Sequence, residues 1–397
     1  MENKPTVGMA CNITTGRLDS NQAVVGGKYP FFTCSESPVE IDSYAFDDDV
    51  VLVAGNNAQG NFHLNRYKGK FNAYQRTYVL TARNNFDINF IYYSLKLELK
   101  RLKEKSQGSQ TKFLTKPLLE NIHLRDIDKS EQLKISSILR AIDSKTEVNS
   151  KINVKLESMA KTIYNYWFVQ FDFPDKNGKP YKSSGGKMVW NEALKRKIPE
   201  GWNVKEMNDL LTKNKDGYDF QTKMRDIDTL DLSIMPSATM CLNEKNSSKN
   251  FKTNLFQLKK YDILFGGIRP YLLKAGFAPF DGLVTGTVHS FKANNDNEYN
   301  FLILTMVHES MFNFAVKNSK GTKMPIIGVD DLLKYKVPYC NEIIEKFNEL
   351  ISFREIISHN ILENQNLTEL RDFLLPMLMN GQIQVADSPK VLSREAV

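Results

Sequence analysis

The sequence is poor in the features that indicate covalent cross-links, secretion or membrane insertion. Its 397 residues include only four cysteines, which are scattered and form no Cys-x-x-Cys pair. The N-terminus lacks the apolar segment of a signal peptide, and no run of about 18 apolar residues occurs. We therefore expect no disulfide framework, no cysteine metal site and no membrane partner, and we place the chain in a reducing cytoplasm.

The sequence also lacks the short motifs of several enzyme classes. There is no glycine-rich P-loop for a nucleotide phosphate, and no Pro-Pro step for the base-binding loop of an adenine methyltransferase. His308-Glu309 lacks the second histidine of a zinc-protease motif, and Pro174-Asp175 is not followed by the carboxylate and lysine spacing of a nuclease. We expect no catalytic residue, no metal site and no cofactor bound by this chain.

The charge is only slightly biased. Lysine and arginine total 53 against 46 acidic residues, so the formal net charge is +7. Such a bias is compatible with nucleic acid as a partner but is weak support by itself. The internal organisation of the chain is more informative.

The chain repeats itself with an offset of 211 positions, which places the Thr111-Lys112 loop on Thr322-Lys323. At this offset five apolar residues of the first copy fall on leucines of the second: Leu139, Leu156, Met159, Ile163 and Trp167. With a two-residue slip, Asp49 matches Asp262, each before a short apolar run. The order of features also repeats, from a mixed segment through a Thr-Lys loop and a short strand to a long helix. We expect two copies of one structural unit.

Two long segments have the pattern of coiled-coil helices, although a buried core helix is the alternative for each. The first has an apolar seam with polar interruptions, made of Ile135, Ile138, Ile142, Lys145, Asn149, Ile152, Leu156, Met159, Ile163 and Tyr166. The second has a less regular seam of Ile343, Phe347, Leu350, Phe353, Ile357, Ile361, Leu367, Leu370 and Leu374. We expect antiparallel pairing about a pseudo-two-fold axis, with Asn149 fixing the register and Pro376 stopping or kinking the second helix.

The remaining segments alternate strand and helix patterns. Strands are expected at residues 50–53, 78–81, 262–265 and 287–291, and helices at 88–105 and 299–316. The acidic triplet Asp47-Asp48-Asp49 would repel phosphate and should begin a strand away from DNA. The polar stretch Asp175–Lys187 has the composition of a linker.

The predicted fold class is α/β, with two α/β domains separated by two long antiparallel helices that form a coiled coil with an internal pseudo-two-fold repeat. The predicted parts are a first domain (1–125), a central helix (126–174), a linker (175–197), a second domain (198–338), a distal helix (339–381) and a C-terminal tail (382–397).

Candidate DNA-reading residues are amides, cations and hydroxyls on glycine-rich loops, because amides and guanidinium groups read base edges and cations bind phosphate. In the first domain they are Asn56, Asn57, Gln59, Asn61, Arg66, Lys68, Lys70, Gln75, Arg76 and Lys112. In the second domain they are Arg269, Tyr271, Lys274, Thr285, Thr287, His289 and Lys323. The alternative for each position is a solvated polar loop.

The chain resembles the specificity subunits of type I restriction–modification systems over nearly its whole length. The features that carry the resemblance are, in chain order, YPFFTCS, DVVLVAGNNAQGNF, GSQTKFL, LLENIHL, YNYWFVQFDFP, IPEGW, YDILFGGIRPY and GTKMPIIGVDDLLKYKVP. One departure concerns the first copy, which has no counterpart of Pro199–Trp202. Either it lacks an edge element or the tail after Gly381 completes it.

The resemblance implies that each domain is a target-recognition domain that reads one half of a split, asymmetric site in double-stranded DNA. It implies that the helices set the gap between the halves and dock two methyltransferase subunits, and that two motor-nuclease subunits join for cleavage. S-adenosylmethionine, ATP and Mg²⁺ would belong to those partners. Two other readings stay open, a stand-alone DNA-modifying enzyme and a coiled-coil scaffold that binds only proteins.

Overall fold

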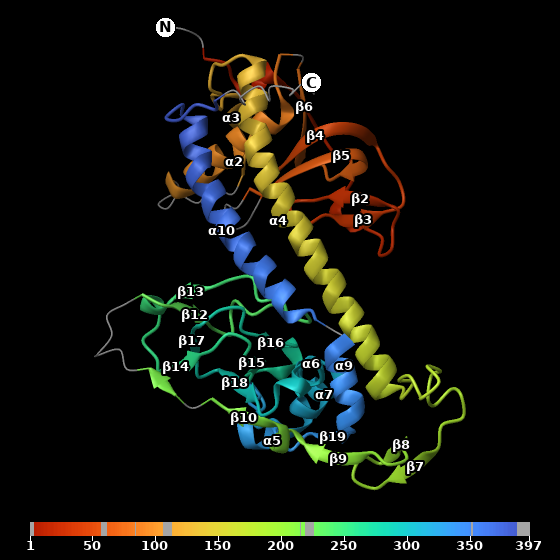
Figure 1. Ribbon diagram of the computed structural model, residues 1–397. Helices are drawn as coiled ribbons and strands as arrows, with labels where there is room; N and C mark the ends of the chain where they lie inside the picture. The colour runs from red at the N-terminus through yellow and green to blue at the C-terminus, as the bar shows by residue number, and fades with distance from the viewer. Residues whose placement is uncertain are drawn as a thin grey trace, which may run out of the picture. The chain divides into compact units, whose positions relative to one another are not determined.

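The computed structural model describes residues 4–56, 62–83, 85–105, 113–214, 216–218, 226–350 and 352–386. The chain divides into two compact units, and each is described here by itself (Figure 1). Unit 1 comprises Met1–Lys145 and Leu367–Val397, and unit 2 comprises Thr146–Asn366. Both divisions fall inside long helices, so each unit contains one part of each helix. The domain limits expected at residues 125, 174 and 338 stay predictions.

Unit 1 contains a six-stranded sheet with the order β1-β6-β4-β5-β2-β3. The strands are β1 (Cys11–Thr15), β2 (Tyr29–Phe32), β3 (Val39–Ile41), β4 (Phe46–Ala54), β5 (Leu64–Ala73) and β6 (Thr77–Ala82). All neighbours pair antiparallel except β2 and β5, which run parallel. Residues 50–54 of β4 are buried on both faces of the sheet, and their side chains point alternately to the two faces. Val51 and Val53 pack in one cluster with α2 (Ile88–Lys105), and Val50 and Leu52 pack in another with Phe71.

Several sequence predictions for unit 1 are confirmed. The strands expected at residues 50–53 and 78–81 lie within β4 and β6, and the helix expected at residues 88–105 is α2. The acidic triplet lies near the beginning of β4, as expected. Two short helices, α1 (Val7–Ala10) and α3 (Lys116–Glu120), also belong to the unit, and their buried residues pack in the cluster that includes α2. After Gly381, Ile383 and Val385 pack against the cluster formed by α2 and the long helices.

Unit 2 contains two larger sheets and two ribbons. The four-stranded sheet has the order β10 (Leu211–Lys213), β18 (Val288–Ala293), β15 (Ile263–Gly266) and β16 (Ala275–Phe277). The five-stranded sheet has the order β11 (Gly217–Tyr218), β14 (Leu255–Leu258), β17 (Gly282–Thr285), β12 (Asp228–Leu230) and β13 (Asn246–Ser247). The ribbons pair β9 (Asn203–Glu206) with β19 (Lys336–Tyr339), and β7 (Met188–Asn191) with β8 (Arg196–Pro199). The strands expected at residues 262–265 and 287–291 correspond to β15 and β18.

Two boundary predictions for unit 2 are corrected by the structure. The single helix expected at residues 299–316 is two helices, α6 (Tyr299–Met306) and α7 (Glu309–Asn318), because the His308 side chain caps α7 by accepting a hydrogen bond from the Ser310 amide at 3.2 Å. The segment expected to be a linker includes β7 and the beginning of β8. Its turn is held by the Asn191 side chain, which accepts hydrogen bonds from the amides of Ala193 and Leu194. Helices α5 (Met207–Leu210) and α8 (Val329–Leu332) are short.

The first long helix, α4 (Lys129–Tyr164), continues into a π-helical turn at Asn165–Val169. The second is divided into α9 (Asn341–Leu350) and α10 (Arg354–Met379), which corrects the expectation of one continuous distal helix. Tertiary contacts account for the break, because Phe353 is buried in the core of unit 2 and Arg354 forms two 2.8 Å hydrogen bonds to Asp296. Pro376 lies inside α10, which ends three residues later.

The predicted seams are only partly correct. In α4 the buried face includes Ile135, Leu139, Ile142, Asn149, Asn153, Glu157, Ala160 and Tyr164. Ile152, Met159 and Tyr166, which were expected in the seam, are 39%, 60% and 42% exposed, and Leu350 and Leu370 of the second seam are also exposed. The apolar pattern misplaced the seam because polar side chains with specific partners, Asn149, Asn153 and Glu157, occupy three of the buried positions after Ile142.

Candidate nucleic-acid interface

Strand β4 of unit 1 is followed by Gly55, whose backbone bonds to two other segments of the chain. We call Gly55 in unit 1 and its counterpart in unit 2, each with the residues it contacts, a glycine corner. The Gly55 amide donates to the Arg76 carbonyl at 2.8 Å, and the Gly55 carbonyl accepts from the Leu114 amide at 2.9 Å. The Tyr78 hydroxyl donates to the Leu114 carbonyl at 2.9 Å. A Cβ atom at Gly55 would lie 2.7 Å from the Arg76 carbonyl oxygen, so only glycine fits here. The corner thus joins the C-terminal end of β4, the turn just before β6 and the segment that follows the first Thr-Lys loop.

Unit 2 contains a corner of the same design. The Gly267 amide donates to the Thr287 carbonyl at 2.9 Å, and the Gly267 carbonyl accepts from the Ile327 amide at 2.9 Å. The Nε2 atom of His289 lies 2.8 Å from the Ile327 carbonyl oxygen, which makes His289 the counterpart of Tyr78. A Cβ atom at Gly267 would lie 2.6 Å from that Nε2 atom. Burial lowers the pKa of His289 and favours the neutral imidazole.

Further contacts occur in the same order in both units. The Val7 amide donates to the Ile122 carbonyl in unit 1, and the Met207 amide donates to the Tyr335 carbonyl in unit 2, both at 2.9 Å. The edge strands also correspond, since Cys11 pairs with Ala82 in unit 1 and Leu211 with Ala293 in unit 2. The structural correspondence therefore extends beyond the residues that the sequence repeat identified.

In unit 1 the corner brings part of the predicted set together. Gln75 and Arg76 are exposed in the turn between β5 and β6. They line a groove of about 400 Å³ whose lining also includes Gly55, Phe113 and Lys116. Asn56 forms a β-bridge with Phe113 at the same place. Asn57, Gln59, Asn61 and Lys112 lie outside the described residues.

The other predicted cations of unit 1 lie along β5. The Arg66 guanidinium donates to the carbonyls of Val50 and Tyr67 and to the Asn89 side chain, and it forms an ion pair with Asp49. These contacts give Arg66 a structural role, so we place it in the fold and not in the proposed interface. Lys68 and Lys70 are exposed two positions apart, and the Lys70 ammonium lies 4.6 Å from the centroid of the Tyr44 ring. A hydrogen bond with Tyr44 raises the pKa of Lys70.

In unit 2 two loops meet beside Gly267. Arg269 has left-handed backbone geometry, with φ of 51°, and its amide donates to the Pro325 carbonyl at 2.8 Å. This bond joins the loop that carries the exposed side chains of Arg269 and Tyr271 to the loop that carries exposed Lys323. The corner therefore gathers two cations and one aromatic ring on adjacent loops.

The remaining predicted residues of unit 2 have internal partners. The Lys274 ammonium donates to the Leu232 carbonyl at 2.7 Å, and the hydroxyls of Thr285 and Thr287 lie 2.9 Å apart. Thr285 is buried. We therefore regard these three residues and His289 as supports of the corner. The sequence did not predict that Tyr78, Gly55 and Gly267 have related roles in the two corners. The 211-residue offset, which places Tyr78 on His289, was the signal that could have shown it.

The described residues contain no group of three or more histidine, cysteine or acidic side chains placed to hold a metal ion. In the part of the chain that the structure describes, no helix combines the length and apolar character needed to cross a bilayer. The exposed side chains of the candidate interface are cationic, amide and aromatic, and backbone hydrogen bonds join the loops that carry them to the corners.

Comparison with known proteins agrees with the predicted class. Residues 7–158 match the family model described as the type I restriction modification DNA specificity domain. The fold is also similar to a crystal structure of a type I restriction–modification S subunit from M. genitalium, with a TM-score of 0.57, 17% identity and coverage of 98% of this chain and 96% of that one.

Two relatives are named as specificity subunits. The chain is 27% identical to the type I restriction enzyme EcoDI specificity subunit of Escherichia coli, over 98% of this chain and 91% of the relative. It is 25% identical to the MjaIX specificity subunit of Methanocaldococcus jannaschii, over 75% of this chain and 69% of the relative. The family model and the relatives confirm the resemblance to specificity subunits of type I restriction–modification systems, and the M. genitalium structure agrees with the fold.

Proposed function

We propose that the chain reads a bipartite, asymmetric site in double-stranded DNA, one half with each glycine corner. The observation that carries this proposal is the repeated corner, in which equivalent glycines, aromatic side chains and amide contacts hold loops with exposed cations. Arg76 in unit 1, and Arg269, Tyr271 and Lys323 in unit 2, are the described residues that we assign to DNA contact. Loops on a fixed scaffold are suited to reading bases, because the loop side chains can differ between the two units while the backbone that holds the loops is the same.

We further propose that α4 and α10 pair antiparallel about a pseudo-two-fold axis and set the gap between the half-sites. Within unit 2, the Asn149 side chain donates to Asn364 at 2.9 Å, and the Asn360 side chain donates to Asn153 at 2.8 Å. The 211-residue offset relates Asn149 to Asn360 and Asn153 to Asn364. The offset thus relates the Asn149–Asn364 hydrogen bond to the Asn360–Asn153 hydrogen bond. Such a pair of related contacts is expected on the two sides of a two-fold axis.

The length of the helices fits a spacer. The 36 residues of α4 span about 54 Å at a rise of 1.5 Å per residue, which exceeds one turn of B-DNA, about 34 Å. Two readers joined by such a spacer gain affinity only when the gap in the DNA matches the gap in the protein. We propose that the helices also dock two methyltransferase subunits, that two motor-nuclease subunits complete the complex, and that the partners bind S-adenosylmethionine, ATP and Mg²⁺.

Methylome sequencing tests this function. The chain is co-expressed with a type I methyltransferase subunit, and methylated adenines are mapped across the genome. We expect one bipartite motif whose halves are separated by a fixed number of unspecified bases. A contiguous motif, or methylation by the purified chain alone, would contradict the proposal.

The scaffold alternative predicts a different binding experiment. A DNA-reading subunit should bind its site with an affinity that falls steeply as salt concentration rises, because phosphate contacts release counterions. Failure to bind DNA at any salt concentration, even with the methyltransferase subunit present, would favour a scaffold that binds only proteins.

A further inference from the structure

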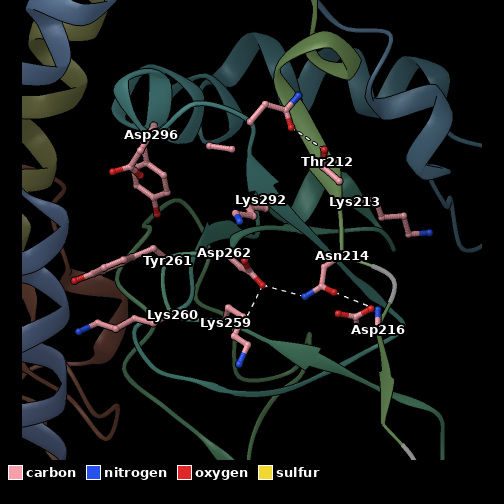
Figure 2. A pocket seen from close by; sticks show the side chains of 13 residues that line it. Thr212, Lys213, Asn214, Asp216, Lys259, Lys260, Tyr261, Asp262, Lys292 and Asp296 are labelled. Carbon is pink, nitrogen blue, oxygen red and sulfur yellow. Dashed lines mark hydrogen bonds between the residues drawn. The ribbon is translucent and has the colours of Figure 1, made fainter.

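A pocket of about 710 Å³ lies in unit 2 beside β10, the beginning of β15 and the end of β18 in the four-stranded sheet. It is built from the end of β10, the turn before β15, the end of β18 and the beginning of α6 (Figure 2). The glycine corner follows the opposite end of β15, which spans about 13 Å over its four residues. The pocket is therefore separate from the loops that we assign to base reading.

The lining of the pocket is rich in cations. Lys213, Lys259, Lys260 and Lys292 lie around it on three segments of the chain and are all exposed (Figure 2). None of the ion pairs found among the described residues involves these four lysines. Lys292 does interact electrostatically with the Asp262 carboxylate at longer range. Clustered ammonium groups raise the local concentration of anions.

The acidic side chains of the pocket do not cancel this charge. Both oxygens of Asp296 accept 2.8 Å hydrogen bonds from Arg354. Asp262 is buried and accepts from the Asn214 side chain, the Lys259 amide and the Ser290 hydroxyl at 3.0–3.2 Å. Burial raises the pKa of Asp262, while the hydrogen bonds and Lys292 act in the opposite direction. Asp216 is the remaining carboxylate of the lining.

A buried donor without a partner lies at the same place. Tyr299 lines the pocket and is 3% exposed, and its hydroxyl has no hydrogen-bond partner within the described part of the chain. A buried polar group left unsatisfied costs free energy, so its presence calls for an explanation. An acceptor bound in the pocket would satisfy this hydroxyl.

We propose that this pocket is a phosphate-binding site. A phosphoryl group has several acceptor oxygens and up to two negative charges, and it suits several ammonium groups together with a hydroxyl donor. The volume is within the range of small-molecule sites, roughly 300–1,000 Å³, and holds a mononucleotide. The phosphoryl group comes from a free nucleotide or from the backbone of bound DNA outside the bases that are read.

Isothermal titration of the full-length chain with inorganic phosphate, pyrophosphate and AMP tests the site without any DNA. We expect saturable binding, and about tenfold weaker binding by the Lys259→Ala/Lys292→Ala variant, since it loses two charge-assisted contacts. Lys252→Ala is the matched control, because this exposed lysine lies in the same unit outside the pocket lining. Equal affinity in all three proteins, or no saturable binding of any probe, would overturn the proposal.

A second variant tests the buried donor. Tyr299→Phe removes an unpartnered hydroxyl, so it should fold normally and bind phosphate about fivefold more weakly. Unchanged affinity in this variant would refute the buried donor's part in the site. If phosphate and AMP compete with a DNA fragment that contains the recognised site, the DNA backbone is the source. If they bind without competition, the ligand is a free nucleotide. Since the titration uses no DNA, its failure is distinguishable from failure of the proposed function.

Discussion

The reciprocal asparagine pairs of unit 2 allow a quantitative test of how the helices are held in register. Asn153 and Asn360 are 3% and 6% exposed, and one 2.8 Å hydrogen bond joins their side chains. Replacing Asn153 alone with leucine leaves the buried amide of Asn360 without its partner. Such an unsatisfied group costs about 1–3 kcal/mol.

Replacing both asparagines with leucine removes the polar groups together and should be nearly neutral or stabilising. Each single variant should cost about 1–3 kcal/mol and the double almost nothing, so the predicted coupling energy of the double-mutant cycle is about 2–6 kcal/mol in magnitude. Urea unfolding followed by far-UV circular dichroism measures the free energy of unfolding of the wild-type chain, both single variants and the double variant. Asn366→Leu is the matched control, since this asparagine is exposed on the same helix, and it should change stability by less than about 0.5 kcal/mol.

The same proteins also test what the asparagines contribute besides stability. If they specify one helix register, the double variant should be as stable as the wild type and yet lose a single fixed gap between half-sites. Additive destabilisation by the two leucines would refute the reasoning. An intact gap in the double variant would show that other contacts determine the register.

Four further predictions concern the corners and the spacer. Gly267→Ala should destabilise the chain by about 1–3 kcal/mol, because its Cβ would lie 2.6 Å from the His289 Nε2 atom, and thermal unfolding would show it. Arg76→Ala and Arg269→Ala should each weaken DNA binding and, if the contact is to phosphate, reduce the salt slope by about 1; unchanged affinity in both would remove them from the interface. Deleting about one heptad from both long helices should alter the gap in the methylated motif and leave its halves unchanged. Burial depresses the folded-state pKa of His289, so its contribution to stability is present above the usual histidine pKa and is lost as pH falls through the folded value; His289→Gln should flatten the decrease in melting temperature between about pH 8 and about pH 5.

The local pattern of apolar residues was sufficient to predict the elements whose buried residues lie close together in the sequence. The run Val50–Val53 predicted the buried C-terminal half of β4, and the apolar spacing at residues 88–105 predicted α2 with its observed limits. The 211-residue offset also linked corresponding loops before any contact was known. These features depend on side-chain periodicity, which is a property of nearby residues.

Contacts between distant residues decided the rest. The helix break before Arg354 depends on Asp296, and the division between α6 and α7 depends on the cap formed by His308. The buried face of α4 includes Asn149 and Asn153 because their hydrogen-bond partners lie on α10, more than 200 positions away. The sequence by itself therefore predicted the resemblance to specificity subunits, the strands at residues 50–53, 78–81, 262–265 and 287–291, and helix α2. Only the tertiary structure identified the glycine corners, because a hydrogen bond such as that from Tyr78 to Leu114 joins residues whose proximity no local pattern encodes.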